Sequence, residues 1–446
     1  MKLKTWICAS LVALAVPLMA QVAEKAAAPA ALDLNKVFLK GVTDKPQPLY
    51  KVGEEITFTL WMDFAGQTPD KGYYFDWTLT GDDGQKKNGR HQVADGKLVV
   101  KTKLDKPGFV RLLAIGKDAD GKPLTKTTGG GDSKRVFFDG GAGAEIEKLQ
   151  GAPEPEDFDE FWKQQRERLA AVPFEGKAMM TECPSKDAAV KIYAVSVPCA
   201  GPRPVTGYMT IPAGAKPKSL PAHCVYYGYG LHYQTPPTSG SKDKIQFFVN
   251  AHGYELGKDK AYQDAFFGSI REDGCSYGFS PKRNQNRETT YFFGMTLRIM
   301  RSLQFVMSLP EWDGKNLIAS GGSQGGLQTV WAAGLEPKVT EAYPSIPWCC
   351  DMQGKESFGR IHGGWRIVGT PALAYYDPIN IAKRIPRTCK VNITRAGLGD
   401  YCCPPSGVAI LYNNIKAPKE IHWVQGSTHG FVPPYPECQK FTQSQP

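Results

Sequence analysis

The first part of the chain alternates apolar and polar residues in short runs. Between about Ala31 and Gly140, segments such as Glu55–Trp61 and Lys97–Lys101 show this alternation, and turns rich in Gly, Asp and Pro separate them. A period of two is typical of strands that bury one face. Residues 31–140 are therefore predicted to form a small all-β sandwich of immunoglobulin-like architecture, and the glycine-rich segment Asp139–Gly143 is interpreted as the break before the next domain.

From residue 152 to residue 446 the pattern changes to strands that alternate with helices. Ile192–Val197 and Val205–Ile211 predict a pair of antiparallel strands, and apolar residues recur at helical intervals between Thr290 and Ser308. Such an order is typical of a doubly wound α/β sheet with helices on both faces. We therefore expect two domains in this chain of 446 residues.

A serine flanked by glycines lies between a predicted strand and a predicted helix. The apolar run Leu317–Ala319 precedes the motif Gly321–Gly325 (GGSQG), and the helix-like stretch Leu327–Ala333 follows it. The glycines let the backbone bend sharply, so that the hydroxyl of Ser323 stands exposed above the sheet. This context predicts the nucleophile elbow of an α/β-hydrolase, with Ser323 as the nucleophile.

A serine nucleophile needs a general base and a group that orients this base. In this fold the acid and then the histidine follow the nucleophile, each on a loop after a strand. Asp400 ends a strand-like segment and His429 lies in the loop beyond the next one, so they are the candidate acid and base. The alternatives are His422, which lies within the strand pattern, and Asp377, whose position before Pro378 is typical of a helix N-cap.

Three longer stretches resemble the acetyl xylan esterase and cephalosporin C deacetylase family. They are Ser308–Asp313 (SLPEWD), Gly321–Gly326 (GGSQGG) and Gly397–Ser406 (GLGDYCCPPS). The resemblance runs from about Ala152 to the C-terminus. It implies that residues 152–446 form an α/β-hydrolase catalytic domain, to which the predicted sandwich is an N-terminal addition.

The resemblance also implies the roles of the site residues. Ser323, Asp400 and His429 would form the catalytic triad, and the backbone N–H groups of Gln324 and Tyr229 would form the oxyanion hole. Independently of the resemblance, the hole is expected to combine the N–H after the nucleophile with one from a loop after an early strand.

The activity implied is that of a serine esterase, a carboxylic ester hydrolase that removes acetyl or other short acyl groups from carbohydrates. Its partner would be an acetylated oligo- or polysaccharide, and no cofactor is expected. One alternative is a serine peptidase of the prolyl-oligopeptidase type, although its usual propeller domain does not fit in about 110 residues. The other is a non-catalytic carbohydrate-binding protein that retains a hydrolase shell.

The N-terminus is typical of a secretory signal peptide. Lys2 and Lys4 precede the apolar run Trp6–Leu18, and Ala20 lies among small residues, so residues 1–20 are predicted to be removed on export. The apolar run is too short for a membrane span. The mature protein is expected to be periplasmic or secreted.

Charge and cysteine content constrain the partners further. The net charge of +10 comes from dispersed Lys and Arg residues without a basic run, which argues against nucleic-acid binding.

Of the 11 cysteines, Cys8 falls in the signal peptide, and none of the ten others (11 − 1) is spaced as Cys-x-x-Cys, so no metal site is predicted. A disulfide is expected between the pairs Cys349–Cys350 and Cys402–Cys403, because each pair follows one of two neighbouring parallel strands. The oligomeric state is left open.

Overall fold

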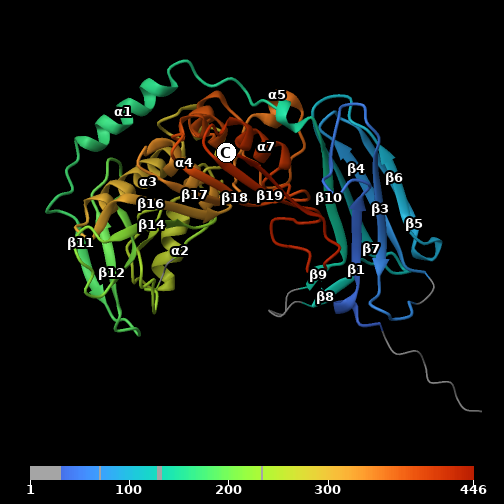
Figure 1. Ribbon diagram of the computed structural model, residues 1–446, viewed down its shortest axis with the longest axis horizontal. Helices are drawn as coiled ribbons and strands as arrows, with labels where there is room; N and C mark the ends of the chain where they lie inside the picture. The colour runs from blue at the N-terminus through green and yellow to red at the C-terminus, as the bar shows by residue number, and fades with distance from the viewer. Residues whose placement is uncertain (1–31, 70–71, 128–132, 233–234) are drawn as a thin grey trace, which may run out of the picture.

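The computed structural model describes residues 32–69, 72–127, 133–232 and 235–446. The predicted signal peptide lies outside these residues. Figure 1 shows a β-rich unit, formed by the N-terminal part of the chain, beside a larger α/β unit that contains the rest. The order of the domains is therefore the predicted one, with an all-β domain before the α/β-hydrolase domain.

The N-terminal domain consists of two facing sheets with an apolar core between them. Strand β3 alternates buried and partly exposed residues, and Ile56, Phe58 and Leu60 are fully buried, as the sequence pattern predicts. The first sheet has the order β1 (Phe38–Thr43), β3 (Ile56–Asp63), β6 (Leu98–Thr102). The second has the order β2 (Leu49–Tyr50), β10 (Phe137–Ala144), β7 (Gly108–Lys117), β4 (Tyr74–Gly81), β5 (Lys86–Gln92), and β8 (Thr125–Thr127) pairs with β9 (Ser133–Arg135).

The glycine-rich segment Asp139–Gly143 is not the break between domains that we predicted. It is the middle of β10, which continues to Ala144 and pairs antiparallel with β7. Glycine fits there because other backbones come very close to the strand. A Cβ atom on Gly141 would lie 2.6 Å from the carbonyl oxygen of Val110 and 3.0 Å from that of Leu398 in the second domain. These glycines thus mark a contact between the domains and not a linker.

The second domain is built on a ten-stranded sheet whose six adjacent strands from β15 to β19 run parallel, with antiparallel strands at both edges. The antiparallel pair predicted within residues 192–211 is confirmed as β12 and β13. The strand order is β11 (Met179–Cys183), β12 (Val190–Val197), β13 (Val205–Pro212), β15 (Ile245–Asn250), β14 (Leu220–Tyr226), β16 (Trp312–Gly322), β17 (Glu341–Ser345), β18 (Lys390–Gly397), β19 (Lys419–Val424), β20 (Lys440–Gln445).

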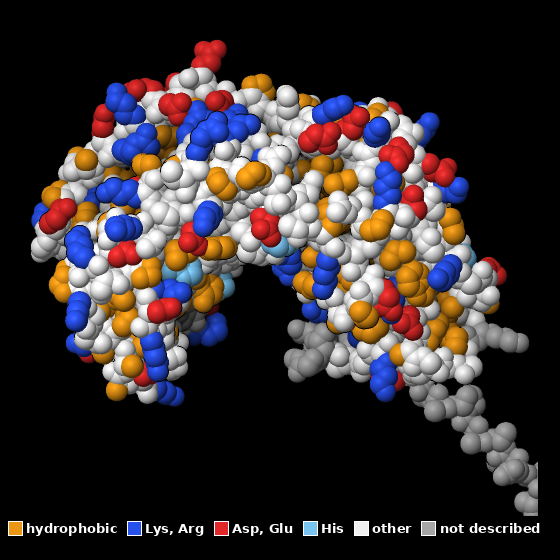
Figure 2. Space-filling view, in the orientation of Figure 1, with side chains coloured by type: hydrophobic (Ala, Val, Ile, Leu, Met, Phe, Trp, Pro, Cys, Tyr) orange, Lys and Arg blue, Asp and Glu red, His pale blue; other side chains and the backbone are white. Residues whose placement is uncertain are grey.

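Helices cover this sheet, and α3 confirms the helix predicted before the nucleophile strand. The α-helices are α1 (Phe158–Ala170), α2 (Lys260–Ser269), α3 (Tyr291–Ser308), α4 (Gln324–Leu335), α5 (Gly354–Phe358), α6 (Pro378–Ile381) and α7 (Pro405–Asn414). Short 3₁₀ helices are η1 (Leu34–Lys36), η2 (Val93–Asp95), η3 (Ile146–Lys148), η4 (Arg283–Gln285), η5 (Pro371–Tyr375) and η6 (Ala382–Arg384). None of the helices in the described residues is long and apolar enough to cross a membrane. Figure 2 shows acidic and basic side chains interspersed over the visible face.

The loops that follow β18 and β19 rest directly on the N-terminal domain. The side-chain amide of Gln425, just after β19, accepts a hydrogen bond from the N–H of Gly141 (2.9 Å) and donates one to its carbonyl (2.8 Å). Arg111 on β7 donates two hydrogen bonds to Asp139 on β10 (2.8 and 2.6 Å), and its guanidinium lies 4.2 Å from the ring centre of Tyr401. The sandwich therefore supports both loops in which the sequence places catalytic residues.

Two further contacts widen this interface. Phe109 of β7 is buried in the core of the second domain, with its ring centre 5.8 Å from that of Trp423 on β19. Gln439, just before β20, accepts a hydrogen bond from the N–H of Thr43 (2.9 Å) and donates to the carbonyl of Lys45 (2.7 Å). The interface thus combines apolar packing with backbone hydrogen bonds.

Candidate active site

Ser323 occupies a sharp turn between β16 and α4. Its backbone dihedrals, φ 58° and ψ −119°, are rare for a residue with a side chain and place it outside both the strand and the helix. A Cβ atom on Gly321 would lie only 2.5 Å from the carbonyl oxygen of Tyr226 and 2.6 Å from that of Gly325. Glycine is needed at this turn because the backbone of β14 passes so close to it. The structure therefore has the nucleophile-elbow geometry that the sequence predicts.

Backbone hydrogen bonds hold the turn in place. The N–H of Ser323 donates to the carbonyl of Ser345 at the end of β17 (2.9 Å), and the N–H of Trp348 donates to the carbonyl of Ser323 (3.1 Å). The side chain of Ser323 is half-buried. These bonds fix a strained residue in one orientation, as a nucleophile requires.

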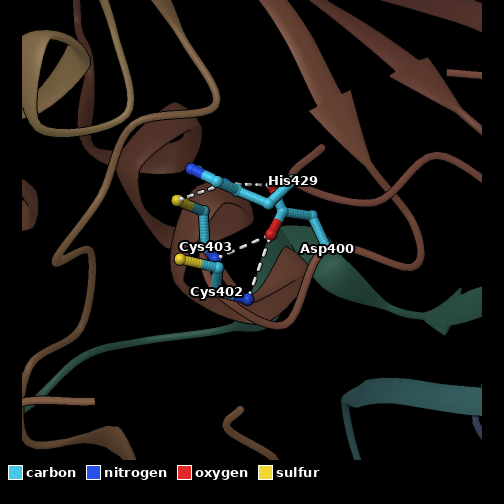
Figure 3. Close-up of side chains that lie close together, drawn as sticks. All are labelled: Asp400, Cys402, Cys403 and His429. Atoms are coloured by element: carbon cyan, nitrogen blue, oxygen red, sulfur yellow. Dashed lines mark hydrogen bonds and ion pairs between the residues drawn. The ribbon is translucent and has the colours of Figure 1, made fainter. Parts of the chain in front are cut away.

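Asp400 and His429 are brought together as predicted. Asp400 is buried, and its Oδ2 lies 3.0 Å from Nδ1 of His429. Its Oδ1 accepts hydrogen bonds from the N–H groups of Cys402 and Cys403, both 3.0 Å long (Figure 3). Because a carboxylate only accepts, Nδ1 carries the proton when the ring is neutral, and Nε2 can act as a base in that form.

A hydrogen bond between Ser323 and His429, the predicted nucleophile and base, is not formed in this structure. Within the described part of the chain, the hydroxyl of Ser323 makes no hydrogen bond, although Asp400 and His429 are joined. Catalytic hydrogen bonds are often long in enzymes without substrate and tighten only in the complex. The predicted acid and base are thus in contact, whereas Ser323 stands apart from them.

The imidazole and a neighbouring thiol shift each other's protonation. The pKa of His429 is raised, first because Asp400 accepts a hydrogen bond from the ring and then because Cys402 interacts with the ring, while burial acts in the opposite direction. The pKa of Cys402 is lowered to about 6, chiefly by its hydrogen bond with Cys403 and, against the effect of burial, by His429. Both shifts favour a positive imidazolium beside a negative group.

The two rival residues have other partners. His422 lies on β19, where its Nε2 is 2.7 Å from Glu420 and its Nδ1 is 3.0 Å from the Thr442 hydroxyl. Asp377 is confirmed as the N-cap of α6 and accepts hydrogen bonds from the N–H groups of Asp351, Met352 and Ile379. Neither His422 nor Asp377 joins the Asp400–His429 pair.

The loop that was expected to complete the oxyanion hole lies beside the nucleophile. A Cβ atom on Gly228 would be 4.0 Å from the Cβ atom of Ser323, so the backbone of the loop passes directly next to the elbow. Tyr229 follows on this loop, and Gln324 begins α4 immediately after Ser323. This arrangement suits two backbone N–H donors that act on one oxygen.

Tyr277 is a residue of this site that sequence reasoning missed. Its ring stacks on that of Tyr229, with ring centres 4.2 Å apart. Its hydroxyl accepts a hydrogen bond from the N–H of Gly230 (2.9 Å) and donates one to the side chain of Gln324 (2.8 Å). Tyr277 therefore connects the two segments that carry the expected oxyanion donors. No motif marks it, because this tyrosine lies in a loop far from both segments in sequence.

Several aromatic side chains lie beside the loop that carries Tyr229, which was expected to contribute to the oxyanion hole. The ring of Trp365 lies 5.0 Å from that of Tyr229 and 5.7 Å from that of Phe279, and Trp348 donates its indole N–H to the carbonyl of Trp365 (3.2 Å). Trp365 is 51% exposed, which is unusual for so large an apolar side chain. It therefore offers a flat apolar surface to a ligand.

The predicted disulfide between the two cysteine pairs is not present. Cys349, Cys350 and Cys402 do line one small cavity, so the neighbourhood is as predicted, but all ten cysteines of the described residues are thiols. The sulfur of Cys350 points to the carbonyl of Pro347 (3.4 Å), whereas that of Cys403 lies 3.7 Å from Nδ1 of His429. The prediction was wrong about the bond because the side chains turn to different partners.

Comparison with known proteins identifies the family. A family model described as acetyl xylan esterase (AXE1) matches residues 144–360 and 367–445. The chain belongs to this acetyl xylan esterase family. Its members are carboxylic ester hydrolases, and the matched part begins at the end of β10, so the sandwich precedes the family domain.

Individual relatives agree with the family assignment. Acetyl esterase Axe7A of Xylanibacter ruminicola is 28% identical over 291 residues, which are 62% of this chain and 65% of that protein, so the chain spans just under two thirds of that relative. The acetyl xylan esterase from Paenibacillus sp. R4 has a TM-score of 0.52 at 23% identity, and acetyl xylan esterase 1 from Thermoanaerobacterium sp. JW/SL YS485 has a TM-score of 0.52 at 21%. Each structural match covers 65% of this chain and 94% of the other, and supports the same fold.

Proposed function

We propose that this protein is an exported serine esterase that removes acetyl groups from carbohydrates. The observation that carries the proposal is the pairing of Asp400 with His429 at the sheet edge where Ser323 occupies a strained elbow. Family membership supports the ester hydrolase chemistry. The exposed ring of Trp365 beside the oxyanion loop supports a sugar as the substrate, because the apolar face of a pyranose packs well on a flat aromatic ring.

In the proposed reaction, Nε2 of His429 takes the proton of Ser323 while the serine oxygen attacks the ester carbonyl. The N–H groups of Gln324 and Tyr229 stabilise the oxyanion, and Asp400 holds the imidazole in the required tautomer. His429 then protonates the departing sugar oxygen. Water attacks the acetyl-enzyme while giving a proton to His429, His429 returns this proton to the Ser323 oxygen as its bond to the acetyl group breaks, and acetate leaves.

Two neighbouring serines provide a matched test. Ser323→Ala should lower the hydrolysis of p-nitrophenyl acetate and of acetylated xylo-oligosaccharides by more than about a thousandfold. Ser320→Ala is the control, since this serine also contacts a histidine, His223 (2.7 Å), but lies inside β16. If Ser323→Ala stays active and Ser320→Ala is inactive, the proposal is wrong.

Acyl length and compartment are tested separately. A small acyl pocket predicts that kcat/KM falls from acetyl to butyryl to octanoyl esters, and equal or rising values would contradict a deacetylase. Cleavage of proline-containing peptides would favour the peptidase alternative.

Export is tested by N-terminal sequencing of the mature protein, which should begin near Gln21.

A further inference from the structure

Four side chains with metal-binding atoms converge at the proposed acid–base pair. Asp400, Cys402, Cys403 and His429 each offer one ligand atom, and these four atoms lie within 4.8 Å of one another. Nδ1 of His429 is 3.0 Å from Oδ2 of Asp400 and 3.7 Å from the sulfur of Cys403. Figure 3 shows both sulfur atoms and the imidazole along one side of this cluster. The spacing rules for metal motifs miss the group because its members come from two separate loops.

The local fold places the two thiols next to the carboxylate. Oδ1 of Asp400 accepts the backbone N–H groups of Cys402 and Cys403, which closes a tight turn before Pro404 and α7. Cys403 is buried, whereas Cys402 is partly exposed and the side chain of His429 is 35% exposed. A small ion can therefore reach the cluster from solvent.

The donor set suits a soft divalent ion. Thiolate, imidazole and carboxylate are the ligands that Zn²⁺ takes in tetrahedral sites, and thiolates favour it over Mg²⁺ or Ca²⁺. With bond lengths of about 2.0–2.3 Å, ligand atoms in such a site are about 3.3–3.8 Å apart. No two of the four ligand atoms are more than 4.8 Å apart, so their separations exceed the upper end of this range by at most about 1.0 Å (4.8 − 3.8), which small side-chain rotations can close.

We propose that Asp400, Cys402, Cys403 and His429 form an inhibitory site for Zn²⁺ or a similar soft ion. The inhibitory part of this inference rests on the esterase function proposed above. An ion bound at Nδ1 of His429 leaves the neutral ring with its proton on Nε2, and a protonated Nε2 cannot accept the proton of Ser323. The two thiols release their protons to solvent on binding, and nothing is oxidised or reduced.

Metal binding is tested without catalysis in the full-length Ser323→Ala variant. After treatment with a chelator, Cd²⁺ is added and the ultraviolet absorption of cadmium–thiolate bonds is followed. We expect one equivalent to bind, and Cys402→Ser in the same background to weaken binding by about tenfold or more. Cys183→Ser is the control, because Cys183 is a partly exposed cysteine that lies on β11, away from the cluster. Equal binding with and without Cys402 would overturn the site.

Inhibition is tested in the protein with Ser323 intact. Micromolar Zn²⁺ should abolish p-nitrophenyl acetate hydrolysis, and a chelator should restore it, whereas Cys402→Ser should resist the same Zn²⁺ concentration. Stoichiometric binding with an unchanged rate would refute the inhibitory role. If Ser323→Ala binds Cd²⁺ but the protein with Ser323 has no esterase activity, the metal site stands and the proposed function fails.

Discussion

The contact between Gln425 and Gly141 predicts that the sandwich domain positions His429, the proposed general base. Gln425 is 1% exposed and lies four residues before His429, and its amide satisfies both backbone groups of Gly141. Gln425→Leu keeps the approximate size of the side chain but removes both hydrogen bonds to Gly141, as well as the one that Oε1 accepts from the N–H of Gly426 (3.2 Å). Two buried polar groups on β10 would then have no partner.

The size of the effect follows from those two groups. Each unsatisfied buried N–H or C=O costs about 1–3 kcal/mol, so the free energy of unfolding should fall by about 2–6 kcal/mol. A matched variant is Gln439→Leu, which also breaks hydrogen bonds to the sandwich backbone, at Thr43 and Lys45, but at a half-buried position at the far end of the loop that carries His429, just before β20. Water can replace those bonds, so this variant should lose only about 0.5–1.5 kcal/mol.

Urea unfolding and steady-state kinetics separate stability from positioning. At a temperature where both variants are folded, Gln425→Leu should lower kcat for p-nitrophenyl acetate about tenfold, which corresponds to about 1.4 kcal/mol in the barrier. Its KM should change little, because Gln425 is 1% exposed and so does not face a substrate, and Gln439→Leu should keep its kcat. A destabilised Gln425→Leu protein with full kcat would refute the reasoning, since the contact would then serve only stability.

Three further outcomes are expected. Tyr277→Phe removes the hydroxyl that accepts the Gly230 N–H, and should lower kcat by about tenfold with the fold retained, as circular dichroism would verify. Cys402→Ser removes a group that raises the pKa of His429, and His429 can act as a base only when it is neutral. The acidic limb of the pH profile of kcat/KM, measured with a chelator present, should therefore move to lower pH. A move to higher pH would contradict the interaction between Cys402 and His429. Gly399→Ala should prevent stable folding or greatly lower the melting temperature, because a Cβ there overlaps a carbonyl of β10, and a wild-type melting curve would exclude that close approach.

Much of the second domain could be predicted from local sequence signals. The alternation of strands and helices, the glycines around Ser323 and the order of Asp400 and His429 after it are each properties of short segments or of chain order. The N-cap role of Asp377 was likewise predictable, because the Asp-Pro pair acts within its own helix.

What the sequence could not reveal depends on contacts between distant segments. Tyr277 joins two loops only after the sheet has formed, and nothing in its own neighbourhood indicates this. In the sequence alone, the glycines of β10 resemble a linker. The reason for glycine at this strand is seen only in the folded structure, where the backbone of Leu398 comes close to Gly141. The four proposed metal ligands, Asp400, Cys402, Cys403 and His429, share no spacing motif in the sequence. The first three lie in the loop after β18, whereas His429 lies in the loop after β19.

The docking of β10 also determines how this protein can be divided in the laboratory. A fragment that starts at Ala152 contains every residue of the proposed triad, but it lacks the strand on which the last two loops rest. It would remove both hydrogen bonds between the amide of Gln425 and Gly141, and would leave one face of Trp423 open to water where Phe109 packs. The smallest fragment that keeps the proposed active site intact therefore has to include the sandwich, and shortening or exchanging that domain means redesigning the two loops with it.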